Sequence, residues 1–543
     1  MIKPITIDLV WMALKRNVAL QPDRAALIYQ GSAISFAELD RDSDHLACGL
    51  IDLGFGKGDR LGVLGLNQPE WLLAYLAAAK IGAIVVGLSV RYRDSEIEYI
   101  VNHAKVRAII APAVAGNMDY VAYFASMGER LPSIQHYFFM GRPDLPASQR
   151  LDSLLGTPVE RGRLDRAQAN IVPDDPLVLI YTSGTTGRPK GALITHRSQL
   201  ASATAECSHL GLQPDDLMIL ALPLNHVGGL TCGFLAMLLG GGTSLLIPTF
   251  SPKQVIADML TFPPTIVAGV PTMHTLLLRE EGIGQLDRQR VRLVITGGAN
   301  ADPNLLQQLQ EVFPQARVMN LYGLSETSGA ALMSPWDSNF EAIVRSVGKP
   351  LPGVELRIVT PDGHDAAPGE PGELWIRGEL SVAGYLDMPD ETAASFSDGW
   401  LRTGDLGYCD DCGLVTLLGR SKEMFVQGGF NVYPIEVENA LSRHPDVLMV
   451  AGIGVPDPVL GEVGLYYVVP KPGAQPSAET LTNYCRMLLA DYKVPRQIVF
   501  CESLPMTPAG KIMKARLWEE RPPAGLTQMD AMSAQPTKTV LSQ

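Results

Sequence analysis

Short apolar runs alternate with segments of helical periodicity through the first 420 residues of the chain. Apolar residues three or four positions apart predict helices over residues 70–81 and 303–312. Short apolar runs predict the strands between such helices, at residues 60–64, 83–86, 108–110, 177–181, 265–269, 292–296 and 318–322. This alternation of strands and helices is typical of an α/β fold with largely parallel sheets.

The pattern changes twice toward the end of the chain. Residues 354–358 and 372–377 are short stretches punctuated by Gly and Pro, which predicts a small antiparallel sheet or barrel. Beyond residue 420, strands at 447–455, 464–469 and 497–501 and helices at 435–443 and 480–489 predict a compact α+β unit. We therefore expect a large N-terminal domain of layered α/β sheets with a small β-barrel at residues 1–419, a small mobile α+β C-terminal domain at residues 420–525 and a loose tail at residues 526–543.

One uncharged stretch, residues 227–250, is long enough to span a bilayer. Six glycines and Pro248 interrupt it, and the three consecutive glycines at 240–242 form a helix stop ahead of an apolar run at 243–247. We therefore expect a buried helix followed by a strand, and no transmembrane segment.

Charge and cysteine content narrow the class of protein. The 543 residues carry a formal net charge of -13, which disfavours nucleic acid and anionic lipid as partners because both require a basic face. Seven cysteines, of which Cys409 and Cys412 have CxxC spacing, do not make a disulfide framework or a metal motif. The N-terminus shows no apolar signal segment, so we expect a cytoplasmic location.

Residues 182–191 form a loop rich in glycine and hydroxyl side chains between two predicted strands. Glycine lets the backbone approach an anion closely, and Arg188 and Lys190 add positive charge, so the loop suits a polyphosphate. It is not a Walker A loop, because Gly187 is followed by Arg-Pro-Lys-Gly and Pro189 blocks the usual helix start. A flexible linker is the alternative interpretation, which the flanking strands and the two cations disfavour.

The chain resembles the adenylate-forming superfamily of acyl-CoA synthetases, adenylation domains and luciferases. Five segments carry the resemblance in the family's order: the phosphate loop at 181–191, Tyr-Gly-Leu-Ser-Glu-Thr at 322–327, Gly-Trp-Leu-Arg-Thr-Gly-Asp at 399–405, Gly-Arg-Ser-Lys-Glu at 419–423 and Pro-Ala-Gly-Lys at 508–511. Each segment alone is a weak signal, whereas five in order across about residues 20–520 are specific.

The resemblance implies that a carboxylate is converted to an acyl-adenylate and then to an acyl-CoA thioester. Lys511 would reach the carboxylate and the α-phosphate of ATP during adenylation. Glu326 would ligate Mg²⁺, which prefers one or two carboxylates together with phosphate oxygens. His226 would lie at the acid pocket and orient the carboxylate or gate the pocket, although an ordinary core histidine is the alternative.

The resemblance also implies the residues that bind ATP or AMP. Tyr322 and Asn320 would flank adenine, Asp405 would accept both ribose hydroxyls, and Arg420 would contact ribose or phosphate. Ser325 stands where the family usually has Thr and keeps the hydroxyl. The phosphates would meet Thr182, Ser183, Gly184, Thr185, Thr186, Gly187 and Lys190.

Lys422 occupies the family's hinge position, so the resemblance implies that the C-terminal unit rotates between the two half-reactions. The face at 427–431, with Gly428, Gly429 and Phe430, would then receive coenzyme A, since glycine lets a narrow pantetheine arm approach the backbone. Two departures weaken any transfer of substrate identity. Val426 and Gly428 stand where some members have lysines, and Phe430 replaces a Glu that is common in another branch.

The predicted acyl pocket contains His226, Val227, Gly228, Gly298, Ala299 and Leu324. These segments hold no Arg, Lys or second His, which favours a hydrophobic aliphatic or aromatic acid over a dicarboxylate. The expected activity is therefore that of an ATP-dependent acid:CoA ligase acting on a medium- or long-chain fatty acid or an aryl acid, with ATP, Mg²⁺ and coenzyme A.

Several alternatives remain open. The protein could load a carrier-protein phosphopantetheine, although the chain ends without a carrier or condensation domain, which favours coenzyme A. Luciferase-type oxidation has no support beyond the shared scaffold. A non-catalytic nucleotide- or acyl-binding protein would be expected to lack Lys511, Glu326 or Asp405, and all three are present. The sequence does not decide the acid or whether the protein forms a homodimer.

Overall fold

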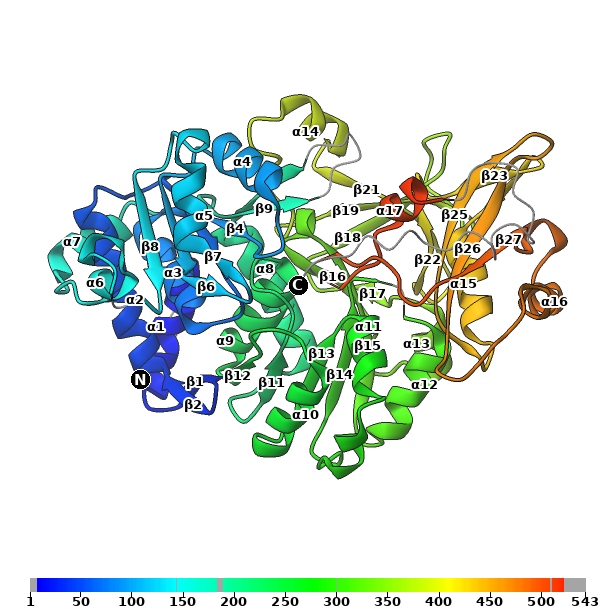
Figure 1. Ribbon diagram of the computed structural model, residues 1–543, viewed down its shortest axis with the longest axis horizontal. Helices are drawn as coiled ribbons and strands as arrows, with labels where there is room; N and C mark the ends of the chain where they lie inside the picture. Colours follow the sequence, from blue (N-terminus) through cyan, green and yellow to red (C-terminus); the bar gives the residue numbers. More distant parts are fainter. Residues whose placement is uncertain (1–6, 143, 183–188, 300, 508–509, 522–543) are drawn as a thin grey trace.

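The computed structural model describes residues 7–142, 144–182, 189–299, 301–507 and 510–521. Figure 1 shows two large sheets with their helices in the N-terminal part, coloured blue to green, and a smaller unit, coloured orange to red, at one end of the molecule. The fold is mixed α/β with a large N-terminal and a smaller C-terminal part, which confirms the predicted fold class.

The first large sheet has six strands, and all neighbours are parallel except the first pair. Helices α1 (Val10–Leu20), α2 (Phe36–Asp52) and α3 (Pro69–Ile81) pack on one face, and α4 (Asp94–His103) and α5 (Tyr120–Met127) pack on the other. The short helices α6 (Leu151–Leu155) and α7 (Arg161–Gln168) lie beside α2 and α3. In spatial order the strands are β10 (Lys190–Thr195), β9 (Pro176–Thr182), β4 (Ile84–Leu88), β3 (Arg60–Leu64), β5 (Ala108–Pro112) and β8 (His136–Met140).

The second large sheet has nine strands, and its six central strands are parallel. One face packs on α10 (Pro252–Thr261), α11 (Pro271–Leu277) and α12 (Pro303–Val312), and the other packs on α8 (His196–Leu210) and α9 (Ala236–Gly240). In spatial order the strands are β17 (Lys349–Pro350), β16 (Gly329–Met333), β15 (Arg317–Leu324), β14 (Leu293–Gly297), β13 (Ile266–Gly269), β11 (Leu217–Leu220), β12 (Thr243–Leu246), β1 (Ala25–Tyr29) and β2 (Ser32–Ser35).

Helix α3 lies in the layer between the two sheets. All of its residues except Glu70 are buried, as expected for a helix that is apolar around its full circumference. Its Lys80 side chain is fully buried and donates to Asp40 at 2.8 Å and to Asp44 at 2.6 Å on α2. These two carboxylates offset the cost of burying the ammonium group.

The uncharged stretch at 227–250 folds as predicted into helix and then strand: a π-helix at Gly228–Leu235, then α9 and β12. Among the described residues, none of the helices combines the length and the apolar character that crossing a bilayer requires.

A five-stranded antiparallel sheet stands where the sequence predicts a small antiparallel sheet or barrel. The C-terminal unit comes after this sheet in the chain. In that unit, α15 (Pro434–Ser442) and α16 (Ala478–Leu488) pack on a second five-stranded sheet. The strands of the first are β18 (Glu355–Val359), β19 (Gly372–Arg377), β20 (Phe396–Ser397), β21 (Trp400–Cys409) and β22 (Val415–Arg420). Those of the second are β23 (Phe425–Gln427), β24 (Phe430–Val432), β25 (Val447–Asp457), β26 (Gly461–Pro470) and β27 (Gln497–Phe500).

Ion pairs join the first and last described segments of the C-terminal unit. Lys514, the first residue of α17 (Lys514–Glu519), lies 2.8 Å from Glu423 and 2.9 Å from Glu438 on α15. The unit also contacts the N-terminal part: Asn304 on α12 donates to the Ser442 carbonyl at 3.0 Å. The boundary at residue 420 stays a prediction.

Candidate active site

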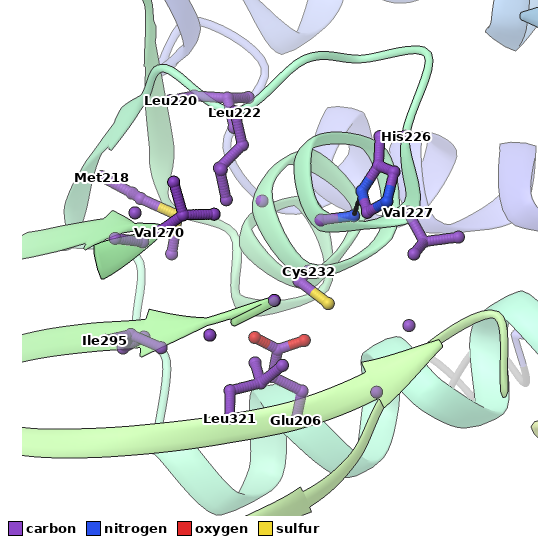
Figure 2. A pocket seen from close by; sticks show the side chains of 18 of the residues that line it. Glu206, Met218, Leu220, Leu222, His226, Val227, Cys232, Val270, Ile295 and Leu321 are labelled. Atoms are coloured by element: carbon purple, nitrogen blue, oxygen red, sulfur yellow. Dashed lines mark hydrogen bonds between the residues drawn. The ribbon is translucent and has the colours of Figure 1, made fainter. Parts of the chain in front are cut away.

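A pocket of 740 Å³, including the space at its open mouth, lies at the carboxyl ends of the parallel strands β11, β13, β14 and β15. Ligands of α/β proteins bind at this edge of a sheet, because the loops that follow the strands converge there. The lining of this pocket is mainly apolar. The residues that line it are Glu206, Met218, Ile219, Leu220, Leu222, His226, Val227, Gly228, Cys232, Gly233, Ala268, Gly269, Val270, Ile295, Gly297, Gly298, Leu321, Gly323, Gly329 and Lys511. Figure 2 shows this pocket from close by.

Lys511 brings a cation from the C-terminal unit into this pocket. Its loop is closed by two hydrogen bonds to Thr507, and the Gly510 carbonyl accepts from the Thr272 hydroxyl of α11 at 3.3 Å. Burial lowers the pKa of Lys511, and the nearby charge of Arg420 lowers it further, whereas Asp405 and Glu326 raise it. The predicted adenylation lysine therefore lies within the electrostatic reach of three other predicted site residues.

Gly298 makes room for this lysine. The residue follows β14 with φ +76°, and a Cβ there would lie 3.2 Å from Lys511 Cε. Glycine adopts this backbone conformation without the penalty that a side chain would bring. The absence of a side chain at residue 298 thus leaves space for the Lys511 side chain in the pocket.

Asp405 and Arg420 are partners across the antiparallel pair β21–β22. Arg420 Nε lies 3.0 Å from Asp405 Oδ1, and the Tyr322 hydroxyl donates to Asp405 Oδ2 at 2.6 Å. Burial raises the pKa of Asp405, while Arg420 and the Tyr322 hydroxyl oppose that rise. The three residues that the sequence assigns to adenine and ribose therefore form one hydrogen-bonded group, in which Tyr322 and Asp405 are buried and Arg420 is exposed.

Glu326 lies in the turn after β15 and is held by Tyr385, whose hydroxyl donates to Glu326 Oε1 at 2.7 Å. The Lys190 ammonium stands 4.9 Å from the centre of the Tyr385 ring. Tyr385 is positioned by pairing with β10, since the Leu386 amide donates to the Gly191 carbonyl at 2.8 Å. Tyr385, which the sequence analysis did not single out, thus links Glu326, the predicted metal ligand, to Lys190 at the end of the predicted phosphate loop.

The predicted phosphate loop begins and ends on paired strands. Thr182, the last residue of β9, lies opposite Lys190, the first residue of β10. The predicted contacts Ser183, Gly184, Thr185, Thr186 and Gly187 lie outside the described residues.

His226 lines the pocket just ahead of the π-helix. Its Nδ1 accepts a hydrogen bond from the Gly228 amide at 3.1 Å, and burial followed by the charge of Lys511 lowers its pKa to about 3. The ring is therefore neutral and carries its proton on Nε2. Gly229 is required here, since a Cβ at this position would lie 2.2 Å from the Pro223 carbonyl oxygen.

Two other predicted site residues lie near the pocket in different settings. The side-chain amide of Asn320 donates to the carbonyls of Ile343 and Ser346 at 2.7 and 2.9 Å, so both of its protons are used within the fold. Ser325 is buried in the turn that carries Glu326. Of the six residues predicted for the acyl pocket, Ala299 and Leu324 are not among those that line it.

The predicted hinge and coenzyme A face lie apart from the pocket. Lys422 is exposed in the turn between β22 and β23. Gly428 and Gly429 form the two-residue hairpin between β23 and β24 with φ of 59° and 88°, and Phe430 stacks on Tyr492 with ring centres 4.6 Å apart. In Figure 1, β23 lies at the far side of the C-terminal unit, well away from β13 and β15.

Sequence reasoning missed Glu206, which lines the pocket from α8 and is 1% exposed. Burial raises the pKa of this carboxyl to about 8. A glutamate on a helix, outside any motif, gives no sequence signal of its own, because most such residues are solvated.

Comparisons with known proteins identify the family of this chain. A family model described as AMP-binding enzyme matches residues 14–386, and one described as AMP-binding enzyme C-terminal domain matches residues 436–511. The chain is 34% identical over 520 residues to 3-[(3aS,4S,7aS)-7a-methyl-1,5-dioxo-octahydro-1H-inden-4-yl]propanoyl:CoA ligase of Rhodococcus jostii, covering 94% of this chain and 98% of the relative. It is 33% identical over 536 residues to a long-chain-fatty-acid--CoA ligase of Yersinia pestis, covering 94% of each.

A solved structure of an adenylate-forming enzyme has a similar fold. The crystal structure of an anthranilate CoA ligase in complex with anthranoyl-AMP matches with a TM-score of 0.87 and 26% identity, over 94% of this chain and 96% of that one.

Proposed function

The chain belongs to the family of AMP-binding enzymes, and from that premise we propose that it is an ATP-dependent acid:CoA ligase. The observation that carries the proposal is the entry of Lys511 into an apolar pocket, within reach of the Asp405–Arg420 pair. The named relatives are acyl-CoA ligases, which supports coenzyme A as the acceptor.

In the first half-reaction, a carboxylate oxygen of the acid attacks the α-phosphorus of ATP, and the bond from that phosphorus to the bridging oxygen of diphosphate breaks. Negative charge accumulates on the α-phosphate and on the leaving group. The Lys511 ammonium would stabilise that charge, and its burial supports this role because electrostatic stabilisation is strongest where water is excluded. His226 would donate from Nε2 to the acid's carboxylate and fix its orientation.

In the second half-reaction, the coenzyme A sulfur attacks the acyl carbonyl, loses its proton and displaces AMP. We propose that the C-terminal unit rotates about Lys422 for this step, so that the hairpin at Gly428 and Gly429 replaces Lys511 at the pocket. In this structure Lys511 lies at the pocket and the hairpin at Gly428 and Gly429 is distant from it, which is the arrangement expected for the first half-reaction. Closure about a few hinge residues is an established type of domain motion.

Glu326 fits the role of a Mg²⁺ ligand. The ion prefers one or two carboxylates plus phosphate oxygens, and Glu326 is a carboxylate positioned by Tyr385 beside the end of the phosphate loop. Bound there, the ion would neutralise charge on the phosphates of ATP.

For the substrate we propose a hydrophobic acid, a medium- or long-chain fatty acid or an aryl acid, used in fatty acid or related acid metabolism. The apolar lining supports this class. We also propose a cytoplasmic location, which the free cysteines of the described chain support, since thiols stay reduced there.

A panel of acids with radiolabelled ATP tests the proposal. Diphosphate release with an acid, followed by AMP and acyl-CoA formation when coenzyme A is added, is the expected result. A carrier protein with a phosphopantetheine arm, supplied in place of coenzyme A, tests the alternative acceptor. No acyl-adenylate with any acid would overturn the proposal.

A further inference from the structure

Three polar side chains follow one face of α8 at helical spacing, and all three are buried: Gln199, Ser202 and Glu206. Gln199 accepts from the Tyr75 hydroxyl at 2.8 Å and donates to Thr231 at 3.1 Å. The Ser202 hydroxyl donates to the Ala330 carbonyl at 3.0 Å. The first two residues therefore have partners within the fold.

Glu206 differs from them. It is 1% exposed, and its Oε2 atom has no hydrogen-bond partner among the residues that the structure describes. A buried polar atom without a partner destabilises the fold, so its presence calls for an explanation. Glu206 also lines the pocket that Lys511 enters, which Gln199 does not.

The direction of the carboxyl group is visible in Figure 2. It points from α8 toward Cys232 and the pocket interior, among Leu321, Ile295 and other apolar side chains. The His226 ring lies on the other side of Cys232 in this view. A substrate with its carboxylate at His226 and Lys511 would thus direct its remote end toward Glu206.

The chemistry of the group follows from its surroundings. Burial favours the neutral carboxyl and raises its pKa, while the nearby Cys232 thiol opposes that rise. A neutral carboxyl has one accepting oxygen and one donating O–H. Glu206 Oε2 has no hydrogen-bond partner among the described residues, so an O–H at this atom is available and requires an acceptor.

We infer that the substrate is an apolar carboxylic acid that carries a carbonyl or hydroxyl oxygen at the end remote from its carboxylate, and that this oxygen accepts a hydrogen bond from Glu206. The inference rests on the proposed acid:CoA ligase activity and refines its substrate class. A site built to hydrogen-bond a substrate group rejects the analogue that lacks it, because the buried partner is then left unpaired. Glu206 is thus a specificity-determining residue.

The test compares four acids of the same carbon skeleton, which carry a methylene, a ketone, a hydroxyl or an amine at the remote position. The kcat/KM for acyl-CoA formation is measured for the wild-type protein, Glu206→Gln, which keeps a donor, and Glu206→Met, which does not. Gln199→Met is the matched control, since it removes a buried polar group from the same helix face without changing the pocket lining.

We expect the wild-type protein and Gln199→Met to prefer the ketone or hydroxyl acid over the unsubstituted acid by about 10-fold or more. Glu206→Gln should keep most of this preference, and Glu206→Met should abolish it while retaining activity on the unsubstituted acid. Equal use of the oxygenated and unsubstituted acids by the wild-type protein, or preference for the amine, would overturn the inference. Failure of every acid to form acyl-CoA would instead contradict the proposed function.

Discussion

Gly298 and Lys511 come from different parts of the chain and meet at the pocket, where a Cβ on residue 298 would lie 3.2 Å from Lys511 Cε. Gly298→Ala should therefore strain the backbone at φ +76° and crowd the lysine. We expect acid-dependent ATP–diphosphate exchange to fall about 10-fold or more, the scale of a small displacement of a positioned group. Gly284→Ala is the control, since a Cβ there has no described atom within 4 Å. Equal exchange by both variants would contradict the prediction.

Lys511→Ala should lower adenylation by about 100-fold or more, which is the scale for loss of one transition-state donor. The same ATP–diphosphate exchange assay measures it. Lys253→Ala removes an exposed lysine of α10 and should leave the rate unchanged. Unaltered exchange by Lys511→Ala would remove this residue from the first half-reaction.

Lys422→Pro should spare adenylation and impair thioester formation, because proline fixes φ at the predicted hinge and restricts Ser421 before it. The two steps are measured separately, by diphosphate exchange and by transfer of preformed acyl-adenylate to coenzyme A. Lys422→Ala separates loss of the ammonium from loss of backbone freedom. Equal losses in the two steps would argue against a hinge.

Glu206 should make stability depend on pH. The carboxyl ionises near 4.5 in the unfolded chain and near 8 in the fold, so the folded state holds the extra proton between these values. Wild-type stability then falls as pH rises from about 4.5 to about 8, whereas Glu206→Gln lacks this loss. The other titratable groups lining the pocket are Cys232, His226 and Lys511.

Urea unfolding at a series of pH values measures this effect. The free energy of unfolding of Glu206→Gln, relative to the wild-type protein, should increase through this window. A difference that does not vary with pH would mean that Glu206 is not held neutral.

The central strands could be predicted from sequence because they are buried on both faces and therefore appear as unbroken apolar runs. The bounds of β3 and α12 match the prediction at both ends. Strand β16 could not be predicted from sequence, since Gly-Ala-Ala-Leu-Met lacks the β-branched and aromatic side chains typical of strands. Its place is set by pairing with β15.

Part of the candidate site could be predicted because its residues belong to local sequence motifs. Asp405, Arg420 and Tyr322 were each assigned to the nucleotide from a motif, and the structure joins them by hydrogen bonds. Glu206 and Tyr385 were not predicted, because each acts through tertiary contacts that no local pattern encodes.

The ion pair between Lys514 and Glu423 has a mechanical consequence. On one side of the turn after β22, Arg420 is anchored to Asp405, and on the other side Glu423 is anchored to the last described helix. In the proposed rotation, torsion between the N-terminal part and the C-terminal unit would therefore be concentrated near Lys422, since the Ser421 amide also donates to the Gly404 carbonyl at 2.9 Å. Such a short hinge would let one rigid-body rotation of the C-terminal unit move Lys511 away from the pocket and bring the hairpin at Gly428 and Gly429 to it. The C-terminal unit itself would not need to change its internal structure.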